Sequence, residues 1–420
     1  MSLFLSWYHF LWSFFGALFF GFPSRRIFVL GVTGTKGKST VLELINAILE
    51  AAGRKTALLS SIRIKIDKQS RKNYLGNTMP GRAFIQSFLR QAVNGGCEYA
   101  LVEATSQGVL QHRHRFIKWD AALFTNLAPE HIEAHKGFEN YRKAKGDFFK
   151  HVAGQKNSGQ KLIFINQNDA NSRYFAEAAK GGKVILYSKP EIHNSLFIIP
   201  NSLIGDFNQE NIAAAIVFAQ SQGISDEIIK KAVESFPGVP GRMEIIQTEP
   251  FTVIVDYAHT PDSLEKVYQA IHNSLFIIPN SRMICVLGSA GGGRDKWKRP
   301  KMGEIAGKYC EEIILTNEDP YDENPSQILS QIKSGISNFL RQSRESSTKS
   351  GQFPISKVFE ILDRKGAIKK AISLAKKGDV VIITGKGCEP WLHTKNGKKI
   401  PWDEKKIVEE LIKEIKRLTN

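Results

Sequence analysis

The stretch that most limits the fold of this chain is GVTGTKGKST, at residues 31–40. It follows the apolar run IFVL and precedes the amphipathic segment VLELINAILEAAG. A buried strand, a glycine turn and a helix are therefore expected in direct succession. Glycines let backbone amides approach phosphate oxygens, and the helix adds the positive end of its dipole. The stretch predicts a phosphate-binding loop, with a glycine-rich structural turn as the alternative.

The side chains of this loop have expected tasks. Lys38 can reach the β- and γ-phosphates of a nucleotide, while Ser39 or Thr40 places a hydroxyl on Mg²⁺. The loop departs from the strict Walker pattern, because Val32 stands where that pattern has its first glycine. The ATP-binding residues predicted here are Gly34, Thr35, Lys36, Gly37, Lys38, Ser39 and Thr40.

Short apolar runs recur along the chain between helical patterns. The first series consists of KTALLSS, YALVEAT, AALFTNL, KLIFIN and KVILYS. A second series follows the Pro/Gly cluster FPGVPGR at 236–242 and consists of FTVIVDYAH, MICVLGS, EIILTN and DVVIITG. Strands that alternate with helices predict an α/β fold with mostly parallel sheets. A chain of 420 residues is also too long for one ordinary core. We expect a P-loop ATP-binding domain over 27–238 and a Rossmann-like α/β domain over 239–420.

The first 26 residues form an apolar segment that stands apart from the rest. MSLFLSWYHFLWSFFGALFFGFPSRR carries no formal charge before Arg25 and Arg26. Its length can just cross a bilayer, and the arginines would keep the following domain on the cytoplasmic side. No positive region precedes the run, which argues against a signal peptide. A helix with membrane contact through residues 3–22 is predicted, and a buried or membrane-surface helix is the alternative.

The net charge of +17, from 58 Lys and Arg against 41 Asp and Glu, would attract nucleic acid, anionic lipid or a polyanionic substrate. Much of the excess is scattered over helix-like segments, so a solvated basic surface is an equal alternative. We expect no nucleic acid partner, because no basic and aromatic stripe of the kind that binds strands is evident. The four cysteines form no CxxC pair, which fits a reducing compartment.

The segment IHNSLFIIPNS occurs twice, at 192–202 and at 271–281, in contexts that do not match. Two copies in unrelated surroundings exclude a solenoid repeat. The duplication has no functional account.

A second group of polar residues lies in LVEATSQGVLQHR (101–113) and TNLAPEHIEAHKGFENYRKAKGDFF (125–149). Glu103 follows an apolar strand and should lie at the carboxyl end of the sheet, where open α/β sheets bind ligands. His131, His135 and Lys145 supply further polar groups. Each also has a plain interpretation, as a helix cap, surface histidines and an exposed amine. Composition does not decide between these.

In their order and spelling, nine segments resemble the Mur ligases, the ATP-dependent amide-bond ligases that build the peptide stem of the bacterial cell wall. The similarity covers roughly residues 27 to 415 and is greatest to the branch that adds the third stem residue. The segments are VTGTKGKST, EATSQGVLQHR, TNLAPEHIEAHKGFENYRKAK, GDFNQENIAAA, PGRMEII, DYAHTPDSLEKV, GSAGGGRDKWKRPKMG, TNEDPYDENP and GKGCEPW.

The resemblance implies that ATP phosphorylates a carboxylate of the acceptor and that an amine then attacks the acyl phosphate. Both steps gather negative charge, so positioned cations are the main requirement. By the same resemblance, Lys38 holds the transferred phosphoryl group and Ser39 one Mg²⁺. Glu103, His131 and an N6-carboxylated Lys145 hold a second Mg²⁺, because carboxylation turns the lysine cation into an anion.

The resemblance also assigns residues to ATP, acceptor and amino acid. For ATP, these are Asn208 or Asn211 at the adenine, Arg242 at the γ-phosphate, and Asp256 and His259 on the ribose and phosphate side. For the muramoyl-dipeptide acceptor, they are Thr78, Thr105, Gln111 and Arg113. For the incoming amino acid, they are Arg294, Glu318, Asp319, Pro320, Tyr321, Gly385 and Glu389.

The chain departs from the family pattern in three places. Tyr321 stands where enzymes that use diaminopimelate carry an arginine for the distal carboxylate, so lysine or another diamino acid without that group is expected. Cys388 replaces a histidine. Full-length relatives carry a separate UDP-binding domain before the phosphate loop, and only the apolar segment precedes it here. UDP recognition is therefore unsupported, and the acceptor could be presented at a membrane or by another protein.

The predicted function is an ATP-dependent ligase acting on a UDP-N-acetylmuramoyl-dipeptide-like precursor in the cytoplasm, attached to the inner face of the membrane or free of it. One alternative is a Mur-like ligase for another carboxylate, of the polyglutamate or poly-amino-acid type. Others are a non-catalytic ATP-binding membrane subunit and a classical P-loop NTPase. The oligomeric state is left open.

Overall fold

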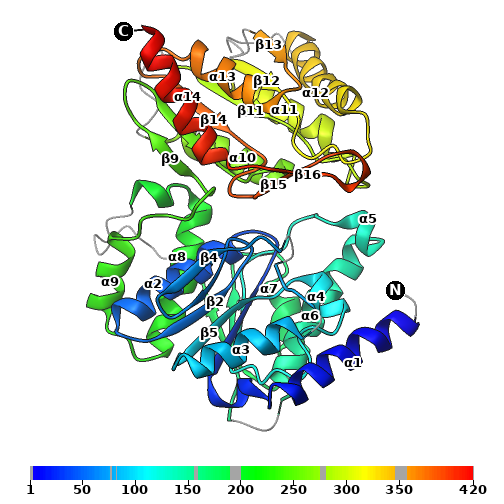
Figure 1. The fold of residues 1–420 in the computed structure, drawn as a ribbon, viewed down its shortest axis with the longest axis vertical. Helices are drawn as coiled ribbons and strands as arrows, with labels where there is room; N and C mark the ends of the chain where they lie inside the picture. The colour runs from blue at the N-terminus through cyan, green and yellow to red at the C-terminus, as the bar shows by residue number, and fades with distance from the viewer. Residues whose placement is uncertain are drawn as a thin grey trace. The chain divides into compact units, whose positions relative to one another are not determined.

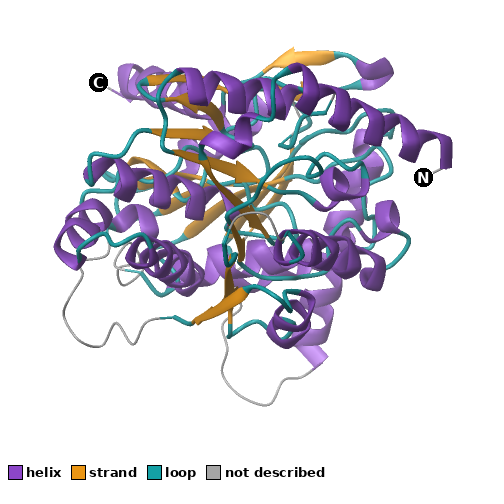
Figure 2. Ribbon diagram, turned by 90° about the horizontal axis from the view of Figure 1, so that it is seen from below, coloured by secondary structure: helices purple, strands orange, loops and turns teal. Residues whose placement is uncertain are grey.

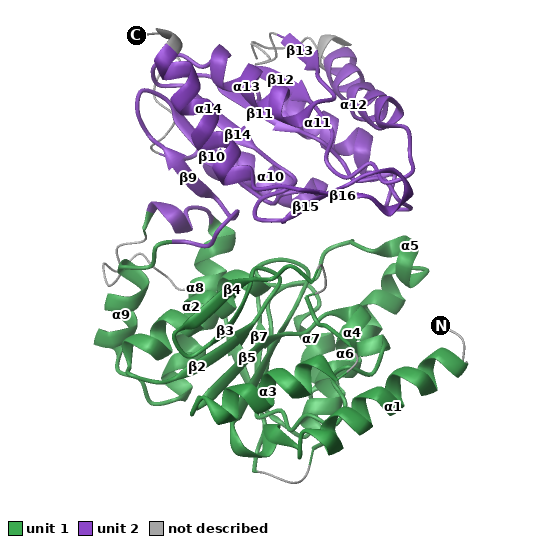
Figure 3. Ribbon diagram, in the orientation of Figure 1, with its two compact units in different colours: residues 1–200, 206–237 green, residues 201–205, 238–420 purple. Residues whose placement is uncertain are grey.

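The computed structural model describes residues 3–75, 78–81, 83–155, 159–189, 200–274, 281–345 and 357–419. The chain divides into two compact units (Figure 3). Unit 1 comprises Met1–Pro200 and Asp206–Pro237, and unit 2 comprises Asn201–Gly205 and Gly238–Asn420. Most of both copies of IHNSLFIIPNS lies outside the described residues.

Unit 1 is built on an eight-stranded sheet with the order β4-β3-β2-β5-β1-β6-β7-β8. Strand β1 (Phe28–Thr33) lies between β5 (Tyr99–Glu103) and β6 (Ala121–Phe124), and it is parallel to both. The carboxyl ends of these three strands therefore meet at one edge, where ligands bind in open α/β sheets. The other strands are β2 (Thr56–Leu59), β3 (Arg63–Ile66), β4 (Gln69–Lys72), β7 (Leu162–Asn166) and β8 (Lys183–Tyr187).

Helices cover this sheet because its strands are apolar on both faces (Figures 1 and 2). Helix α2 begins after the turn that follows β1. Helix α6 packs its aromatic side chains against the same strand, where Phe148 and Trp119 contact each other. The helices are α1 (Leu3–Phe19), α2 (Lys38–Ala51), α3 (Phe84–Asn94), α4 (Ser106–Leu110), α5 (Ile132–His135), α6 (Phe138–Ala153), α7 (Ser172–Ala178), α8 (Asp206–Ser221) and α9 (Asp226–Glu234).

Unit 2 holds a six-stranded sheet with the order β13-β12-β11-β14-β10-β9, in which only β9 is antiparallel to its neighbour. Its strands are β9 (Glu244–Gln247), β10 (Thr252–Val255), β11 (Met283–Leu287), β12 (Glu312–Leu315), β13 (Lys357–Glu360) and β14 (Val380–Ile383), and a separate hairpin pairs β15 (Trp391–His393) with β16 (Lys399–Pro401). Its helices are α10 (Pro261–His272), α11 (Lys298–Tyr309), α12 (Pro325–Glu345), α13 (Arg364–Leu374) and α14 (Glu404–Thr419).

The predicted α/β architecture with mostly parallel sheets is confirmed. The periodicity of the sequence did not reveal the β3–β4 hairpin, because RIKI in β3 alternates charged and apolar side chains and QSRK in the edge strand β4 is polar throughout.

The apolar segment near the start forms helix α1, which has 17 residues. Within the described part of the chain, no helix combines the length and the apolar character that crossing a bilayer requires. The prediction for residues 3–22 is membrane contact, with a true span left open, and this finding does not support a span.

Candidate active site

The turn between β1 and α2 is shaped by two glycines. Gly34 has φ +150°, and a Cβ there would lie 1.9 Å from Thr125 Oγ1. Gly37 has φ +82°, and a Cβ there would lie 2.2 Å from Asn211 Oδ1. Both values of φ disfavour a residue with a side chain, and both positions lack the space for one. The glycines are thus required for the loop to bend back against β6 and α8.

Three polar side chains converge where this loop enters α2. Ser39 Oγ donates to Glu103 Oε2 at 3.0 Å, and Lys38 Nζ lies 3.7 Å from Glu103 Oε1. Lys38 Nζ also donates to the carbonyl of Thr35 at 2.9 Å. Glu103 ends β5 and is 3% exposed, while Ser39 and Thr40 open the helix and are buried. The phosphate loop and the end of the neighbouring strand therefore share one polar cluster.

The rim of the loop is held by residues of the segment after β6. The Lys36 amide donates to Asn126 Oδ1 at 2.9 Å, and the Lys36 ammonium pairs with Glu130 at 3.0 Å. Thr35 Oγ1 lies 3.1 Å from the Tyr141 hydroxyl. The sequence prediction assigned no role to Asn126 or Tyr141. The only signal for them was their place in TNLAPEHIEAHKGFENYRKAK, beside residues that were assigned.

Lys145 on α6 reaches the same loop from the opposite side. Its amine donates to the carbonyl oxygen of Gly34 at 2.7 Å, and the side chain is 2% exposed. Burial lowers the pKa of Lys145 well below its ordinary value, and the nearby Lys38 ammonium lowers it further, against the opposite effect of Glu130 and Glu103. A neutral amine is the form that can react with carbon dioxide, so the site fits a carboxylated lysine.

The two histidines of this region lie around the short helix α5. His131 adopts φ +57° immediately before the helix, and its ring centroid lies 6.2 Å from that of Tyr141. His135 Nε2 lies 3.0 Å from Ser106 Oγ, and burial lowers the pKa of His135 to about 4, with contributions from His131 and Lys145. Across the described ranges, no three His, Cys, Asp or Glu side chains are grouped as a metal site. Of the predicted metal ligands, the structure brings Ser39 and Glu103 into contact.

Asn208 and Asn211 lie on α8 as a buried pair. Asn211 Nδ2 donates to Asn208 Oδ1 at 3.1 Å, and the Asn211 amide fills the space next to Gly37. The two predicted adenine-side residues therefore lie directly against the phosphate loop.

The predicted acceptor residues surround α4. Thr105 caps this helix, since its hydroxyl accepts from the Gly108 amide at 3.1 Å. Arg113 donates from Nη1 to the carbonyl of Met79, next to Thr78, whereas Gln111 Oε1 and Arg113 Nε are buried and have no hydrogen-bond partner among the residues that the structure describes. Burial lowers the pKa of Arg113. Thr78 is half-buried.

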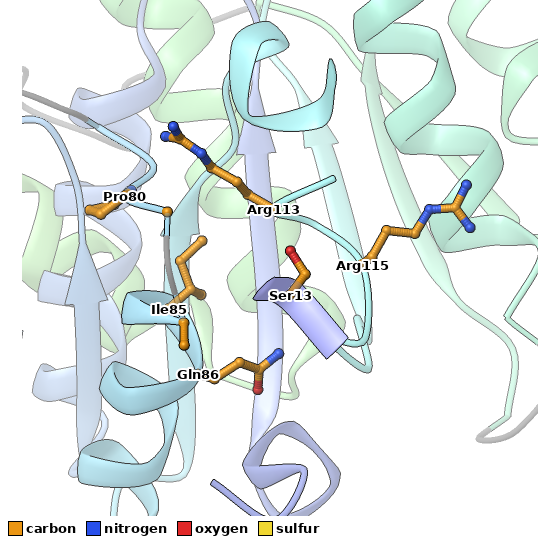
Figure 4. A pocket seen from close by; sticks show the side chains of 8 residues that line it. Ser13, Pro80, Ile85, Gln86, Arg113 and Arg115 are labelled. Carbon is orange, nitrogen blue, oxygen red and sulfur yellow. The ribbon is translucent and has the colours of Figure 1, made fainter. Parts of the chain in front are cut away.

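A pocket adjoins these residues (Figure 4). Ser13 of α1, Gln86 of α3, Arg113 and Arg115 contribute to its lining. In Figure 4 the Arg113 side chain extends toward Pro80, while the Arg115 guanidinium turns away. The two arginines therefore do not converge on one anion.

In unit 2, the predicted nucleotide residues support the turns around β10. The Asp256 carboxylate accepts from the backbone amides of Met243 at 2.7 Å and Ala258 at 2.6 Å. His259 Nδ1 lies 2.8 Å from the carbonyl oxygen of Tyr257, and the Arg242 guanidinium lies 4.0 Å from the centre of the Tyr257 ring. Asp256 thus holds the backbone around the ends of β9 and β10.

Carboxylates predicted to select the amino acid meet around Lys386, which is fully buried. Lys386 Nζ donates to both oxygens of Asp319, at 3.0 and 2.9 Å, and to Glu389 Oε2 at 2.6 Å. Glu389 also accepts from the Tyr257 hydroxyl at 2.8 Å. The single ammonium offsets one of the two negative charges, so the cluster of Asp319, Glu389 and Lys386 keeps a formal net charge of −1.

Glu318 lies deeper in the same cluster. Within the described part of the chain its Oε2 is buried without a hydrogen-bond partner, and burial raises the pKa of Glu318 to about 7. Gly385 has φ +106°, and a Cβ there would lie 2.6 Å from Glu318 Oε2. Gly385 therefore provides the space that this carboxyl group occupies.

Tyr321 presents an aromatic ring at the end of this segment. It has φ +50°, follows Pro320, and stacks on His393 with ring centroids 5.0 Å apart. Burial alone would lower the pKa of Arg294, but the neighbouring Tyr321 hydroxyl outweighs burial, and the pKa of Arg294 is raised. Arg294 and Tyr321 are thus neighbours in unit 2.

The glycine loop on a parallel sheet, together with a second α/β unit, defines a nucleotide-binding enzyme fold. The chain belongs to the Mur ligase family. The Mur ligase middle domain matches residues 32–219, and the Mur ligase, glutamate ligase domain matches residues 241–387. The resemblance inferred from the sequence is therefore confirmed at the level of the family.

Similar proteins include the UDP-N-acetylmuramoyl-L-alanyl-D-glutamate–2,6-diaminopimelate ligase of Aquifex aeolicus, which is 35% identical over 94% of this chain and 79% of its own length. The UDP-N-acetylmuramyl-tripeptide synthetase of a Roseiflexus species is 34% identical over 92% of this chain and 79% of its own length. A solved diaminopimelate ligase of the same name aligns with a TM-score of 0.59 and 26% identity over 93% of this chain and 79% of its own. Folylpolyglutamate synthase of Mycobacterium tuberculosis shares the fold. It aligns with a TM-score of 0.68 and 15% identity over 90% of this chain and 92% of its own.

Proposed function

We propose that this protein is an ATP-dependent ligase that joins an amino acid to a carboxylate of a UDP-N-acetylmuramoyl-dipeptide-like precursor, through an acyl phosphate. One observation carries the proposal: Lys38, Ser39 and Glu103 meet at the phosphate loop, and the buried amine of Lys145 contacts that loop from the other side. The sequence similarity to ligases of this name, at 35% identity over most of the chain, supports the choice of acceptor.

The loop residues provide the electrostatics that phosphoryl transfer needs. The amides that open α2 point along the positive end of the helix dipole, and Lys38 adds a cation beside them. Charge that develops on the transferred phosphoryl oxygens is stabilised by such fixed groups at little reorganisation cost. Glu103 fixes Lys38 and Ser39 at the mouth of the loop until substrate binds.

In this proposal, magnesium would be held by Ser39, Glu103, His131 and a carboxylated Lys145. Magnesium prefers oxygen ligands and neutralises phosphate charge when bound. Hydroxyl and carboxylate oxygens of Ser39 and Glu103 already lie together, and burial lowers the pKa of the Lys145 amine, which favours the form that reacts with carbon dioxide. Carboxylation would replace a buried amine by an oxygen ligand with a negative charge.

The other assignments of the family pattern are proposals of the same kind. The acceptor is proposed to contact Thr78, Thr105, Gln111 and Arg113. It would then bond with Gln111 Oε1 and Arg113 Nε, which have no partner among the described residues. For ATP, we propose that five residues either contact the nucleotide or support the backbone segments that contact it. They are Asn208, Asn211, Arg242, Asp256 and His259.

For the incoming amino acid we propose lysine or ornithine rather than diaminopimelate. Tyr321 presents a ring stacked on His393 where a second carboxylate would need a cation. Glu389 and Asp319 lie nearby and are already paired with Lys386, so they can hold an ammonium group without being isolated buried charges.

The location proposed for this reaction is the cytoplasm, where ATP is available. Membrane contact through residues 3–22 is a separate proposal. It is supported by the exposed apolar side chains of α1.

The test is a ligation assay with purified protein, ATP and UDP-N-acetylmuramoyl-L-alanyl-D-glutamate, offering lysine, ornithine and diaminopimelate in turn. The expected product is a tripeptide that contains lysine or ornithine, identified by mass, with a diaminopimelate product at least about tenfold less abundant. Ligation of glutamate to a folate-type acceptor instead would assign the protein to the other branch that shares this fold. Hydrolysis of ATP without any ligated product would contradict the proposal.

A further inference from the structure

Helix α1 carries an exposed apolar stripe that the proposed chemistry does not use. The stripe consists of Phe4, Trp7, Leu11, Phe15, Leu18 and Phe19, which are between 44% and 84% exposed. Their spacing of three and four residues places them along one side of the helix. Monomeric soluble proteins rarely expose a contiguous apolar patch of this extent without a binding partner.

The opposite side of α1 is docked on unit 1. Phe10 and Phe14 pack edge to face against Phe116, with ring centroids 5.1 and 5.3 Å apart. Ser6 Oγ lies 2.8 Å from His112 Nε2, and Ser13 Oγ donates to the carbonyl oxygen of His112 at 3.0 Å. The exposed stripe is therefore the outer face of a fixed helix, as its course beside α3 in Figure 1 shows.

Two further contacts fix the helix at its carboxyl end. A Cβ at Gly16 would lie 2.4 Å from Ala83 Cβ, so glycine allows the close approach of α1 to the start of α3. Arg90 of α3 donates from Nε to the carbonyl oxygen of Phe20 at 2.8 Å. This cation satisfies backbone oxygens just beyond the helix, where a positive charge is favourable.

We propose that the stripe of α1 inserts into the interface of an anionic lipid bilayer, with the helix axis in the membrane plane and its other face docked on unit 1. The helix is 17 residues long, or about 25 Å at 1.5 Å per residue. Trp12 and Tyr8 flank the stripe and are 43% and 37% exposed. Tryptophan and tyrosine favour the headgroup level, because one end of each ring system is apolar and the other is polar.

Charge favours a lipid surface over a second copy of the chain. The segment Leu3–Phe19 contains no Asp, Glu, Lys or Arg, and the exposed Arg25 and Arg26 follow it after residues 20–24. The whole chain carries a net charge of +17. Such a surface repels a copy of itself and is attracted to anionic headgroups. This inference does not depend on the ligase activity.

The test is flotation of the full-length protein with vesicles of phosphatidylglycerol and phosphatidylcholine, or of phosphatidylcholine alone. The wild type is expected to float with the anionic vesicles and much less with the neutral ones. A Leu11→Glu, Phe15→Glu variant should bind the anionic vesicles about tenfold more weakly or worse. The matched control is Leu186→Glu on β8, a leucine 54% exposed like Leu18, which should leave binding unchanged.

Two more measurements distinguish a lipid surface from a second copy of the chain as the partner of the stripe. Arg25→Glu with Arg26→Glu should weaken anionic binding about fivefold for each arginine. Brominated lipids should quench tryptophan fluorescence in the wild type and lose most of that quenching in a Trp7→Phe, Trp12→Phe variant, which keeps the apolar face. Absence of flotation, or equal loss in the Leu186→Glu control, would overturn the proposal. A dimer that the stripe variant dissociates, with no vesicle binding, would assign the stripe to a second copy.

Discussion

The amine of Lys145 lies 2.7 Å from the backbone carbonyl oxygen of Gly34, so a buried lysine of α6 contacts the first glycine of the phosphate loop. This contact joins two segments that are 111 residues apart in the sequence. Burial lowers the pKa of this amine, and the charges of Lys38 and Glu103 act on it from nearby. The position explains why a lysine, rather than an acid, can occupy this part of the site.

The buried amine of Lys145, whose pKa is lowered by burial, predicts carboxylation by carbon dioxide. Protein equilibrated with ¹³C-bicarbonate should show one carbamate resonance by NMR, which is lost in Lys145→Met together with about 100-fold or more of the ligase activity. The matched control is Lys161→Met, another buried lysine, which should keep the resonance. A resonance that survives in Lys145→Met would show that the carbamate forms elsewhere.

The crowding at Gly37 predicts that a substitution there lowers folding stability by more than backbone strain alone would. Gly37→Ala must accept φ +82° and a methyl group 2.2 Å from Asn211 Oδ1, so we expect a loss of about 2 to 3 kcal/mol in folding stability and weaker ATP binding. Gly53→Ala meets φ +75° with open space around it and should cost about 1 kcal/mol, with unchanged ATP binding. Urea unfolding and titration with a fluorescent ATP analogue measure both. Equal effects of the two substitutions would argue against a packed loop.

The buried carboxyl of Glu318 predicts a dependence of stability on pH. Its pKa rises from 4.5 to about 7 on folding because of burial, so the folded state binds the proton more tightly than the unfolded state. This contribution to stability is complete below pH 4.5 and is lost as the pH rises through about 7.

Glu318→Gln should therefore gain stability relative to the wild type between pH 5 and pH 8, by about 2 kcal/mol. Guanidinium unfolding at the two pH values checks this, and Glu360→Gln on the exposed side of β13 serves as the control. A stability difference between wild type and Glu318→Gln that does not change with pH would contradict the raised pKa.

Local patterns were sufficient to predict much of the fold. IFVL followed by glycines and VLELINAILEAAG can form only a buried strand, a turn and a helix, and β1 and α2 have these positions. The parallel strands were visible because they are buried on both faces and therefore read as apolar runs. The β3–β4 hairpin contains no such run in its second strand, since Gln69–Lys72 is a polar edge strand, and it was therefore missed.

Contacts between distant segments could not be read in the same way. Nothing near Lys145 in the sequence indicates burial, because a lysine on a helix usually faces solvent and only the family pattern marked it. Likewise, the packing of Asn211 against Gly37 depends on where α8 crosses the loop. The pairing of Asp319 and Glu389 through Lys386 also depends on tertiary structure. Sequence alone therefore predicted candidate residues but not their partners.

The central claim is that the loop and Lys145 serve transfer of a phosphoryl group to the acceptor's carboxylate. The direct measurement uses an acceptor whose reacting carboxylate carries ¹⁸O, with ATP and the amino acid, and mass analysis of the released phosphate. Formation and breakdown of an acyl phosphate must leave one labelled oxygen in each phosphate released with the amide product. Phosphate without label, or label in AMP, would contradict the account.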